Sequence, residues 1–456
     1  MTTSNPGRLF WTASTQKSLL HSLAVTVPTS QGVGLDGIHP ASVDGWTTKH
    51  KRILAASVSK SLRTGHYRLT SYREGLASRG RGRHPRVFSI PTVRDRVALL
   101  ALKSTLRSIY GIGGPEPPQR KMSRVIDAVD SGVYDYYLKM DIQDFFGSIR
   151  HETLISTVAQ DVPVDPVIRF LERALRNSTV AFGERSRGLS SAPDGLPLGL
   201  PVSSQLAELY LRDFDRSTPP TIRYFRYVDD ILVLSKRPVE SQFDLLVGRL
   251  NRLGLTTHPL GTPGKCDSGK LSEGFDYLGY TLGQGAVRVT PAGMRKIENQ
   301  LARLISQLGK AYRSTSGATD FRRLLWRLEL TIGGCIVDGQ ARGWIRYYNR
   351  TTDLTSLGHL DALVRNLLRR YGLPGGTVTK LFTQAYWASR DNDRFRQFAL
   401  DLDSVDAVAA REHLREHEEW TTSALAALND LEAIAAFRRV VRRHVVDLEH
   451  DLEPAS

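Results

Sequence analysis

The fold of this chain is decided by one stretch, Tyr224-Phe225-Arg226-Tyr227-Val228-Asp229-Asp230-Ile231-Leu232-Val233-Leu234. Aromatic and β-branched residues on both sides of two adjacent aspartates are typical of a β-hairpin, with Asp229 and Asp230 at its tight turn. Neighbouring carboxylates inside an apolar hairpin repel each other and lose hydration unless a cation neutralises them. The stretch therefore favours a site for Mg²⁺, which takes one or two protein carboxylates. A solvated Asp-Asp turn is the alternative that this pattern alone leaves open.

A second apolar strand carries a third carboxylate. Residues 136–146 read Tyr-Tyr-Leu-Lys-Met-Asp-Ile-Gln-Asp-Phe-Phe, so the apolar run ends at Asp141, and a helix-like segment follows from about Ile149 to Val158. Two metal ions about 3.5 to 4 Å apart clamp an in-line phosphoryl displacement, and they need such additional carboxylates. Asp141, Asp229 and Asp230 therefore predict one metal centre.

Four segments, in chain order, resemble the motifs of reverse transcriptases. They are Asp141 with its aromatic pair, residues 195–204 (Gly-Leu-Pro-Leu-Gly-Leu-Pro-Val-Ser-Ser), Tyr227 to Asp230, and Lys265 with residues 275–280. The last segment is similar to the one that closes the palm in group II intron and related prokaryotic enzymes. The resemblance implies an α/β right-hand polymerase with fingers, palm and thumb, followed by a helical C-terminal extension.

The activity that the resemblance implies is RNA-directed DNA polymerisation, with two Mg²⁺ ions as cofactors and Mn²⁺ as a substitute. Asp141 and Asp229 are expected to bridge the metals, Asp230 to support them, and the carbonyl of Ile142 to add a ligand. Lys265 is expected to protonate the leaving pyrophosphate as a general acid; a salt-bridged surface lysine is an equally weighted alternative.

Nucleotide binding is expected at residues that match the fingers and palm motifs. Arg86, with Arg83 as second choice, would neutralise the triphosphate of a dNTP. Phe146 would abut the sugar at its 2′ position, with Phe145 as the alternative candidate. The other interpretation is that the Phe146 ring belongs to the hydrophobic core of the palm. Leu198 and Gly199 belong to the nucleotide loop, where many reverse transcriptases place Gln at the position of Leu198.

An arginine and glycine passage precedes this match. Arg79 and Arg81 alternate with glycines, so several guanidinium groups could fold over phosphate, which they bind bidentately. A disordered basic loop is the alternative. Together with Tyr227, Arg79 and Arg81 are the expected nucleic-acid contacts.

The charge of the chain points to a polyanionic partner. Its 456 residues carry a formal net charge of +15 with a pI near 9.8. Residues 60–124 hold 15 basic and 3 acidic residues, whereas residues 376–456 hold 10 basic and 15 acidic residues. The first 375 residues therefore carry +20, which favours nucleic acid over the alternatives of solubility or an anionic membrane surface.

Cysteine use and hydropathy bear on the compartment. Only Cys266 and Cys335 occur, too few for a disulfide framework or a zinc site, which favours a reducing compartment. No apolar run reaches the roughly 18 residues of a membrane span, and residues 1–10 lack the apolar core of a signal peptide. We expect a soluble cytoplasmic protein.

Periodicity and boundary signals give the domain organisation. We expect an N-terminal segment at 1–30, fingers and palm at 31–285, a helical thumb at 286–375 and a helical extension at 376–456. Helices are expected near 53–62, 97–106, 166–177, 203–214, 290–312, 318–333 and 423–441. Asp95 is expected to cap or orient the second of these helices. Trp344, Tyr347 and Tyr348 are expected in the thumb core rather than stacked on bases.

The biological role is open between lineages. The Leu-Ala-Glu form that ends at Glu208 resembles the defence-associated and abortive-infection "unknown group" reverse transcriptases of bacteria, whereas residues 34–37 and 343–348 resemble group II intron enzymes. We expect an anti-phage enzyme with a structured noncoding RNA as partner. Retroelement or retron synthesis, untemplated or protein-primed synthesis, and non-catalytic RNA binding remain alternatives. The acidic extension is expected to dock RNA or to form a protein surface, with homo-oligomerisation through its helices as one outcome.

Overall fold

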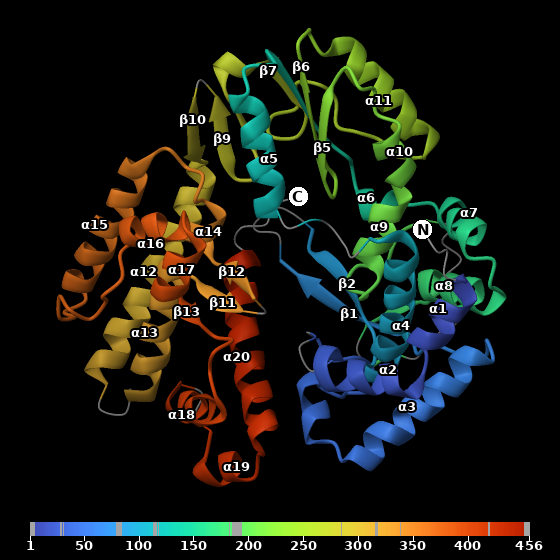
Figure 1. Cartoon of the computed structure of the whole chain (residues 1–456), viewed down its shortest axis with the longest axis horizontal. Helices are drawn as coiled ribbons and strands as arrows, with labels where there is room; N and C mark the ends of the chain where they lie inside the picture. The colour runs from blue at the N-terminus through green and yellow to red at the C-terminus, as the bar shows by residue number, and fades with distance from the viewer. Residues whose placement is uncertain are drawn as a thin grey trace. The chain divides into compact units, whose positions relative to one another are not determined.

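The structure is a computed structural model of the chain, and the two compact units into which it divides are shown in Figure 1. It describes residues 5–27, 30, 32–78, 84–112, 116, 118–181, 183–184, 194–283, 285–314, 318–337, 339–417 and 420–450. One unit comprises residues 1–116 and 137–268, and the other comprises residues 117–136 and 269–456. Each unit is described below by itself.

Helices open the first unit. They are α1 (Pro6–Ala13), α2 (Gln16–His21), α3 (Thr48–Arg63) and α4 (Val93–Tyr110), and the first three pack against α4. The expected helices at 53–62 and 97–106 are confirmed but are longer. The N-cap of α4 is Thr92, whose Oγ1 accepts the N–H of Asp95 at 3.2 Å.

Asp95 is fully buried in the first turn of α4 and has a structural role, as expected. Its carboxylate accepts hydrogen bonds from the Tyr67 hydroxyl at 2.8 Å, the Thr70 N–H at 3.0 Å and the Thr92 hydroxyl at 2.7 Å. These bonds hold the helix against the residues that lead into the first sheet. Asp95 therefore orients α4, and the cap itself is Thr92 rather than Asp95.

A three-stranded sheet has the order β2-β1-β4. Strands β1 (Tyr72–Ala77) and β2 (Arg86–Ile90) are antiparallel, with Arg73 opposite Ile90 and Ala77 opposite Arg86. The short strand β4 (Thr179–Val180) pairs with β1 in parallel. This register places Arg86 at the end of the hairpin.

A four-stranded sheet has the order β5-β6-β3-β7. Its strands are β3 (Tyr136–Asp141), β5 (Arg223–Tyr227), β6 (Asp230–Ser235) and β7 (Asp267–Lys270). In the antiparallel pair β5-β6, Tyr227 lies opposite Asp230, so the hairpin loop consists of Val228 and Asp229. The expected placement of Asp230 in the turn is therefore wrong by one residue: it is the first residue of β6, because its ladder with Tyr227 closes the hairpin. Every residue of β6 is buried, which explains its unbroken apolar run.

Further helices belong to the first unit. They are α6 (Phe145–Ser148), α7 (His151–Asp161), α8 (Asp165–Arg176), α9 (Ser203–Tyr210), α10 (Arg212–Arg216) and α11 (Glu240–Arg252). The single helix expected at 203–214 is wrong, because the helix breaks at Leu211, whose backbone lies at φ −94° and ψ 2°. Asp215 of α10 and Glu208 of α9 both bind Arg226. The helices on the two sides of the break are thus held by the same guanidinium.

The second unit contains α5 (Pro118–Asp130) and a sheet of β8 (Phe275–Tyr277), β9 (Tyr280–Gly283) and β10 (Ala286–Val289). Arg350 donates to Ser123 Oγ at 2.8 Å and to Asp127 Oδ1 at 2.6 Å. Residues 117–136 are thereby tied to a segment more than 200 residues later in the chain.

Two long helices of this unit, α12 (Pro291–Arg313) and α13 (Ala318–Gly333), pack together and confirm the periodicity at 290–312 and 318–333. The remaining elements are β11 (Cys335–Val337), β12 (Gln340–Arg342), α14 (Trp344–Tyr347), α15 (Leu354–Arg370), α16 (Phe382–Ser389), α17 (Asn392–Phe398), β13 (Leu400–Asp401), α18 (Ala407–His417), α19 (Thr422–Ala426) and α20 (Asp430–His450). Trp344, Tyr347 and Tyr348 are buried among one another, which confirms that they belong to the core.

The continuous C-terminal helix expected at 423–441 is wrong. Helix α19 ends at Ala426 and α20 begins at Asp430. Asn429 and Glu432 form a reciprocal capping box, in which the Asn429 N–H donates to Glu432 Oε2 at 2.9 Å and the Glu432 N–H donates to Asn429 Oδ1 at 3.0 Å. This box starts a new helix and separates it from α19.

Two further expectations can be compared with the described residues. None of the helices described is both long and apolar enough to cross a membrane. Cys266 and Cys335 are both buried as free thiols.

Candidate active site

The hairpin loop and the end of β3 bring the three predicted aspartates together. The N–H of Ile142, directly after Asp141, donates to the carbonyl oxygen of Asp229 at 3.2 Å. Asp141 is 5% exposed and Asp230 is 8% exposed, while Asp229 is half-buried. The pairing of β6 with β3 thus places all three carboxylates at one end of the sheet.

These carboxylates are electrostatically unfavourable to one another. Burial, and then the charge of Asp141, raise the pKa of Asp229, and the charges of Lys265 and Arg86 oppose this shift only in part. Burial and the neighbouring Asp229 raise the pKa of Asp230 to about 7. A cation at this position would relieve both the desolvation and the repulsion.

Two cationic or ionisable side chains contact Asp141. Lys265 Nζ lies 2.9 Å from Asp141 Oδ2, and His258 Nε2 lies 3.2 Å from Asp141 Oδ1. The structure therefore brings the predicted Lys265 into the site. His258 was not predicted, because a single histidine in a loop carries no motif.

His258 reaches the site because its segment extends the sheet beyond β3. The N–H of Gln143 donates to the carbonyl oxygen of Thr256 at 2.8 Å, and its side-chain amide donates to that of Thr257 at 3.0 Å. The N–H of His258 then donates to the carbonyl oxygen of Asp141 at 3.2 Å. Residues 256–258 are thus aligned with residues 141–143 by backbone pairing.

The donors are of the kind that a hard divalent cation takes, since all three are carboxylates. In the structure, however, Oδ1 of Asp141 contacts His258 and Oδ2 contacts Lys265. Among the residues that the structure describes, no group of three His, Cys, Asp or Glu side chains is arranged to hold a metal ion. Asp141, Ile142, Asp229 and Asp230 therefore fit a metal in chemical type, and their assignment as ligands stays a prediction.

The two aromatic candidates differ in burial. Phe145 is 2% exposed and belongs to the core, whereas Phe146 is half-buried, and their rings meet edge to face with centroids 5.6 Å apart. Asp144, just before them, has φ 39° and is the N-cap residue of the short helix α6. Of the two rings, Phe146 is the one with surface left for a sugar contact.

The loop that contains Leu198 and Gly199 is fixed from two sides. The Ser89 N–H of β2 donates to the carbonyl oxygen of Leu198 at 2.6 Å, and the Leu196 N–H donates to that of Phe146 at 2.7 Å. Gly199 has φ 95°, and a Cβ there would lie 3.2 Å from the carbonyl oxygen of Ser89. The loop thus joins the Arg86-containing strand to the aromatic pair, and glycine fits because its backbone is left-handed and close to β2.

The other predicted contacts are placed as follows. Arg86 begins β2, and its charge acts on Asp229. Tyr227 is half-buried opposite Asp230. Arg79, Arg81 and Arg83 lie outside the described residues.

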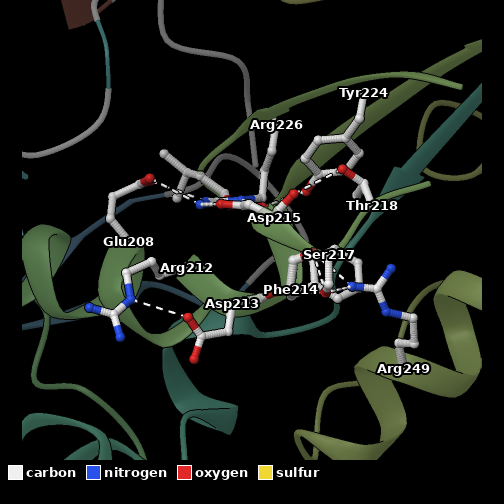
Figure 2. Close-up of polar contacts among 11 residues, drawn as sticks. Glu208, Arg212, Asp213, Phe214, Asp215, Ser217, Thr218, Tyr224, Arg226 and Arg249 are labelled. Atoms are coloured by element: carbon white, nitrogen blue, oxygen red, sulfur yellow. Dashed lines mark hydrogen bonds and ion pairs between the residues drawn. The ribbon is translucent and has the colours of Figure 1, made fainter. Parts of the chain in front are cut away.

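Arg226, in the strand before the turn, was not predicted to take part in the site. It is 6% exposed and lies between the carboxylates of Glu208 and Asp215, as Figure 2 shows. Its Nη2 is 3.0 Å from Glu208 Oε2 and 2.6 Å from Asp215 Oδ2, and its Nη1 donates to the carbonyl oxygen of Val228 at 2.8 Å. An arginine inside a buried strand was the signal in the sequence, because such a charge requires buried partners.

Comparisons with known proteins fit this geometry. Residues 80–282 match the family model described as "Reverse transcriptase (RNA-dependent DNA polymerase)". Two curated relatives, both "Group II intron-encoded protein LtrA" of Lactococcus lactis subsp. cremoris, one of them from strain MG1363, are each 24% identical over 195 residues, which is 41% of this chain and 31% of theirs. The chain thus spans less than a third of the length of these relatives.

The chain is also similar to a solved structure, "Structure of apo telomerase from Candida Tropicalis truncated from C-terminal domain". The two align over 49% of this chain and 55% of that chain, with 12% sequence identity and a TM-score of 0.37. The family match includes Asp141, Asp229 and Asp230. This match confirms the α/β right-hand polymerase fold, and residues 80–282 are similar to the reverse transcriptase family.

Proposed function

We propose that this protein is an RNA-directed DNA polymerase, which adds deoxynucleotides to a 3′ hydroxyl on an RNA template. The observation that carries the proposal is the meeting of Asp141, Asp229 and Asp230 at the end of β3, inside the region that matches reverse transcriptases. Carboxylates that are buried side by side are costly to a fold, and functional sites are where such costs are retained.

The proposed roles of the side chains follow from their placement. Asp141, Asp229 and Asp230, with the carbonyl of Ile142, would hold two divalent cations, which when bound lower the pKa of the attacking hydroxyl and neutralise the charge on phosphorus and the leaving pyrophosphate. Lys265, whose ammonium lies beside Asp141, would supply a proton to the pyrophosphate.

Arg86 acts on the electrostatics of Asp229 and would neutralise the triphosphate. Leu198 and Gly199, fixed between β2 and Phe146, would form the floor of the nucleotide site. Phe146 would contact the sugar and favour dNTPs over rNTPs. Arg79, Arg81, Arg83 and Tyr227 would contact the nucleic acid.

The activity is tested with purified protein, a primed RNA template, Mg²⁺ and labelled dNTPs. The Asp229→Asn variant removes one charge without changing volume, so it should lower incorporation by about a hundredfold or more while the melting temperature stays within a few degrees. Asp244→Asn, at an exposed position on α11, is the matched control and should incorporate like the wild type. Undiminished synthesis by Asp229→Asn would rule out the assigned site.

We further propose that the enzyme acts in anti-phage defence together with a structured noncoding RNA. Two observations support this role: the Leu-Ala-Glu form of α9, and the charge of +20 on residues 1–375, which suits a folded RNA bound through its backbone. Expression with the flanking intergenic sequence should protect cells from phage, and Asp229→Asn should abolish the protection.

A retroelement enzyme of the group II intron type is the second candidate, and the 24% identity over 195 residues to an intron-encoded protein favours it. It makes the opposite prediction, that an adjoining ribozyme splices in the presence of the protein. Sequencing the nucleic acid that co-purifies with the protein distinguishes a noncoding RNA from an intron. DNA covalently attached to the protein would indicate priming by a protein hydroxyl, and a product without a template match would indicate untemplated synthesis.

A further inference from the structure

The guanidinium of Arg226 makes a full set of hydrogen bonds inside the first unit. Nε donates to Asp215 Oδ1 at 2.9 Å, and Nη2 donates to Asp215 Oδ2 at 2.6 Å and to Glu208 Oε2 at 3.0 Å. Nη1 donates to Glu208 Oε1 at 3.1 Å and to the carbonyl oxygen of Val228 at 2.8 Å. An arginine side chain has five N–H groups, so each can be assigned to one of these bonds.

The fifth bond ends on the catalytic hairpin itself. Val228 is the first residue of the two-residue loop, and its φ is 55°. A β-branched residue with this backbone is strained by about 1 to 3 kcal/mol and keeps it only where the surroundings determine it. The bond from Arg226 to the Val228 carbonyl is such a determinant, because it fixes the peptide that joins Val228 to Asp229.

The carboxylates that hold Arg226 also have defined positions. Glu208 lies on α9, which begins at Ser203, and the Ser203 hydroxyl donates to the carbonyl oxygen of Pro197 at 2.6 Å. Asp215 is held by the Tyr224 hydroxyl at 2.7 Å as well as by Arg226 (Figure 2). The guanidinium therefore connects the loop of residues 195–203, by way of α9, to the turn that carries Asp229.

We propose that Arg226 is a positioning residue for polymerisation: it holds the Val228 peptide so that the Asp229 carboxylate faces Asp141. This inference rests on the proposed function. Arg226 acts on metal affinity and on the rate of the chemical step. Its effect is not on dNTP affinity, because neither Arg226 nor its partners Glu208 and Asp215 belong to the residues assigned to dNTP binding. A merely structural ion pair would affect folding stability alone.

The test compares variants that break different bonds of the same guanidinium. Arg226→Lys keeps the charge, but an ammonium cannot reach two carboxylates and the Val228 carbonyl together. Asp215→Asn weakens the ion pair and leaves the bond to Val228 in place, so it is the matched control. We expect Arg226→Lys to lower kcat about tenfold or more with KM for dNTP within threefold, and Asp215→Asn to keep kcat within threefold.

A rescue separates positioning from support. Glycine adopts a positive φ without strain, so V228G removes the need for the Arg226 bond. In the wild-type background, Arg226→Lys should lower kcat tenfold or more. In the V228G background, the double variant V228G/R226K should have a kcat less than threefold below that of V228G alone. An unchanged loss in the V228G background, or a loss seen only in KM, would overturn the proposal.

Metal binding gives a readout that does not depend on synthesis. Titration of the full-length protein with Mn²⁺, followed by electron paramagnetic resonance, should show binding at least fivefold weaker in Arg226→Lys than in the wild type and unchanged binding in Asp215→Asn. Equal Mn²⁺ affinity in all three proteins overturns the inference. Absence of any dNTP incorporation by a wild type that binds Mn²⁺ rejects the proposed function and leaves the Mn²⁺ comparison to decide on Arg226.

Folding of the variants is checked by thermal melting. Should Arg226→Lys fail to fold, the double variant R226K/D215N removes one of the two negative charges that face residue 226 and leaves the lysine charge balanced against Glu208. Compared with Asp215→Asn alone, it should again show a tenfold or larger loss of kcat. A kcat equal to that of Asp215→Asn would overturn the proposal.

Discussion

The Lys265 ammonium lies 2.9 Å from Oδ2 of Asp141, a carboxylate that is almost completely buried. In the absence of a divalent ion, this pair neutralises the aspartate. A bound cation would share the same carboxylate, and the need for Lys265 would then decrease.

Replacing this lysine should therefore destabilise the protein most when metal is absent. Lys265→Met leaves the buried Asp141 charge with only His258, which should lower the free energy of unfolding by about 2 kcal/mol in EDTA. In Mg²⁺ the loss should be smaller by at least half. Urea unfolding in both buffers measures this loss in the free energy of unfolding. Lys236→Met, at an exposed position, is the control. Equal losses in EDTA and Mg²⁺ would contradict a metal site at Asp141.

Removing the charge of Asp230 should stabilise the metal-free protein. Its pKa is raised to about 7 in the folded chain by burial and by Asp229, so at pH 8 the folded state holds an unfavourable charge. Asp230→Asn should raise the free energy of unfolding by about 1 to 2 kcal/mol in EDTA at pH 8.

The sign of this effect fixes its pH dependence. Because the folded pKa lies above the unfolded value, the unfavourable contribution of Asp230 is small near pH 4 and grows as the pH rises through about 7. The gain from Asp230→Asn should therefore be larger at pH 8 than at pH 5. Asp244→Asn should change stability by less than about 0.5 kcal/mol at either pH. A gain that is the same at pH 5 and pH 8 would contradict the raised pKa.

The two aromatic residues after Asp141 should respond differently to truncation. Phe146 is half-buried, so Phe146→Ala should fold and should admit rNTPs if this ring abuts the sugar. Phe145 is buried, and Phe145→Ala should cost about 3 to 5 kcal/mol of stability. The measurements are the ratio of dNTP to rNTP incorporation and a melting curve. Unchanged discrimination in a folded Phe146→Ala protein would refute the gate.

A methyl group at Gly199 should distort the nucleotide loop. Its φ of 95° disfavours any other residue, and the added Cβ would lie 3.2 Å from the Ser89 carbonyl oxygen. Gly199→Ala should lower the free energy of unfolding by about 1 to 3 kcal/mol and raise the KM for dNTP. Gly248→Ala, on α11 with open space around it, should instead stabilise by about 0.5 to 1 kcal/mol. Equal effects of the two substitutions would contradict the fixed loop.

The sequence predicted those parts of the fold that depend on local patterns. The long helices α12 and α13, the hairpin of β5 and β6, and the core position of Trp344 follow from periodicity and apolar runs, which report burial directly. The meeting of the three aspartates was predicted because Asp141 ends an apolar strand and Asp229 and Asp230 follow one another at the turn of a hairpin.

What could not be predicted depends on contacts between distant segments. Asp215, beyond the break at Leu211, pairs with Arg226, and no local pattern reports that pair. His258 reaches Asp141 through backbone pairing of an irregular segment without a motif. The break after α19 was readable in principle, since Asn429 and Glu432 have the spacing of a capping box, but the apolar stripe continues across it.

The loop of the hairpin that carries Asp229 has a consequence for the order of folding. Two-residue loops close readily when glycine or asparagine occupies the positions with positive φ, whereas here Val228 does so. We therefore expect the hairpin to be a poor nucleus by itself, and its turn to close only once α9 has docked and Glu208 meets Arg226. A chain that is only partly folded, such as one still emerging from the ribosome, consequently lacks an assembled set of carboxylates.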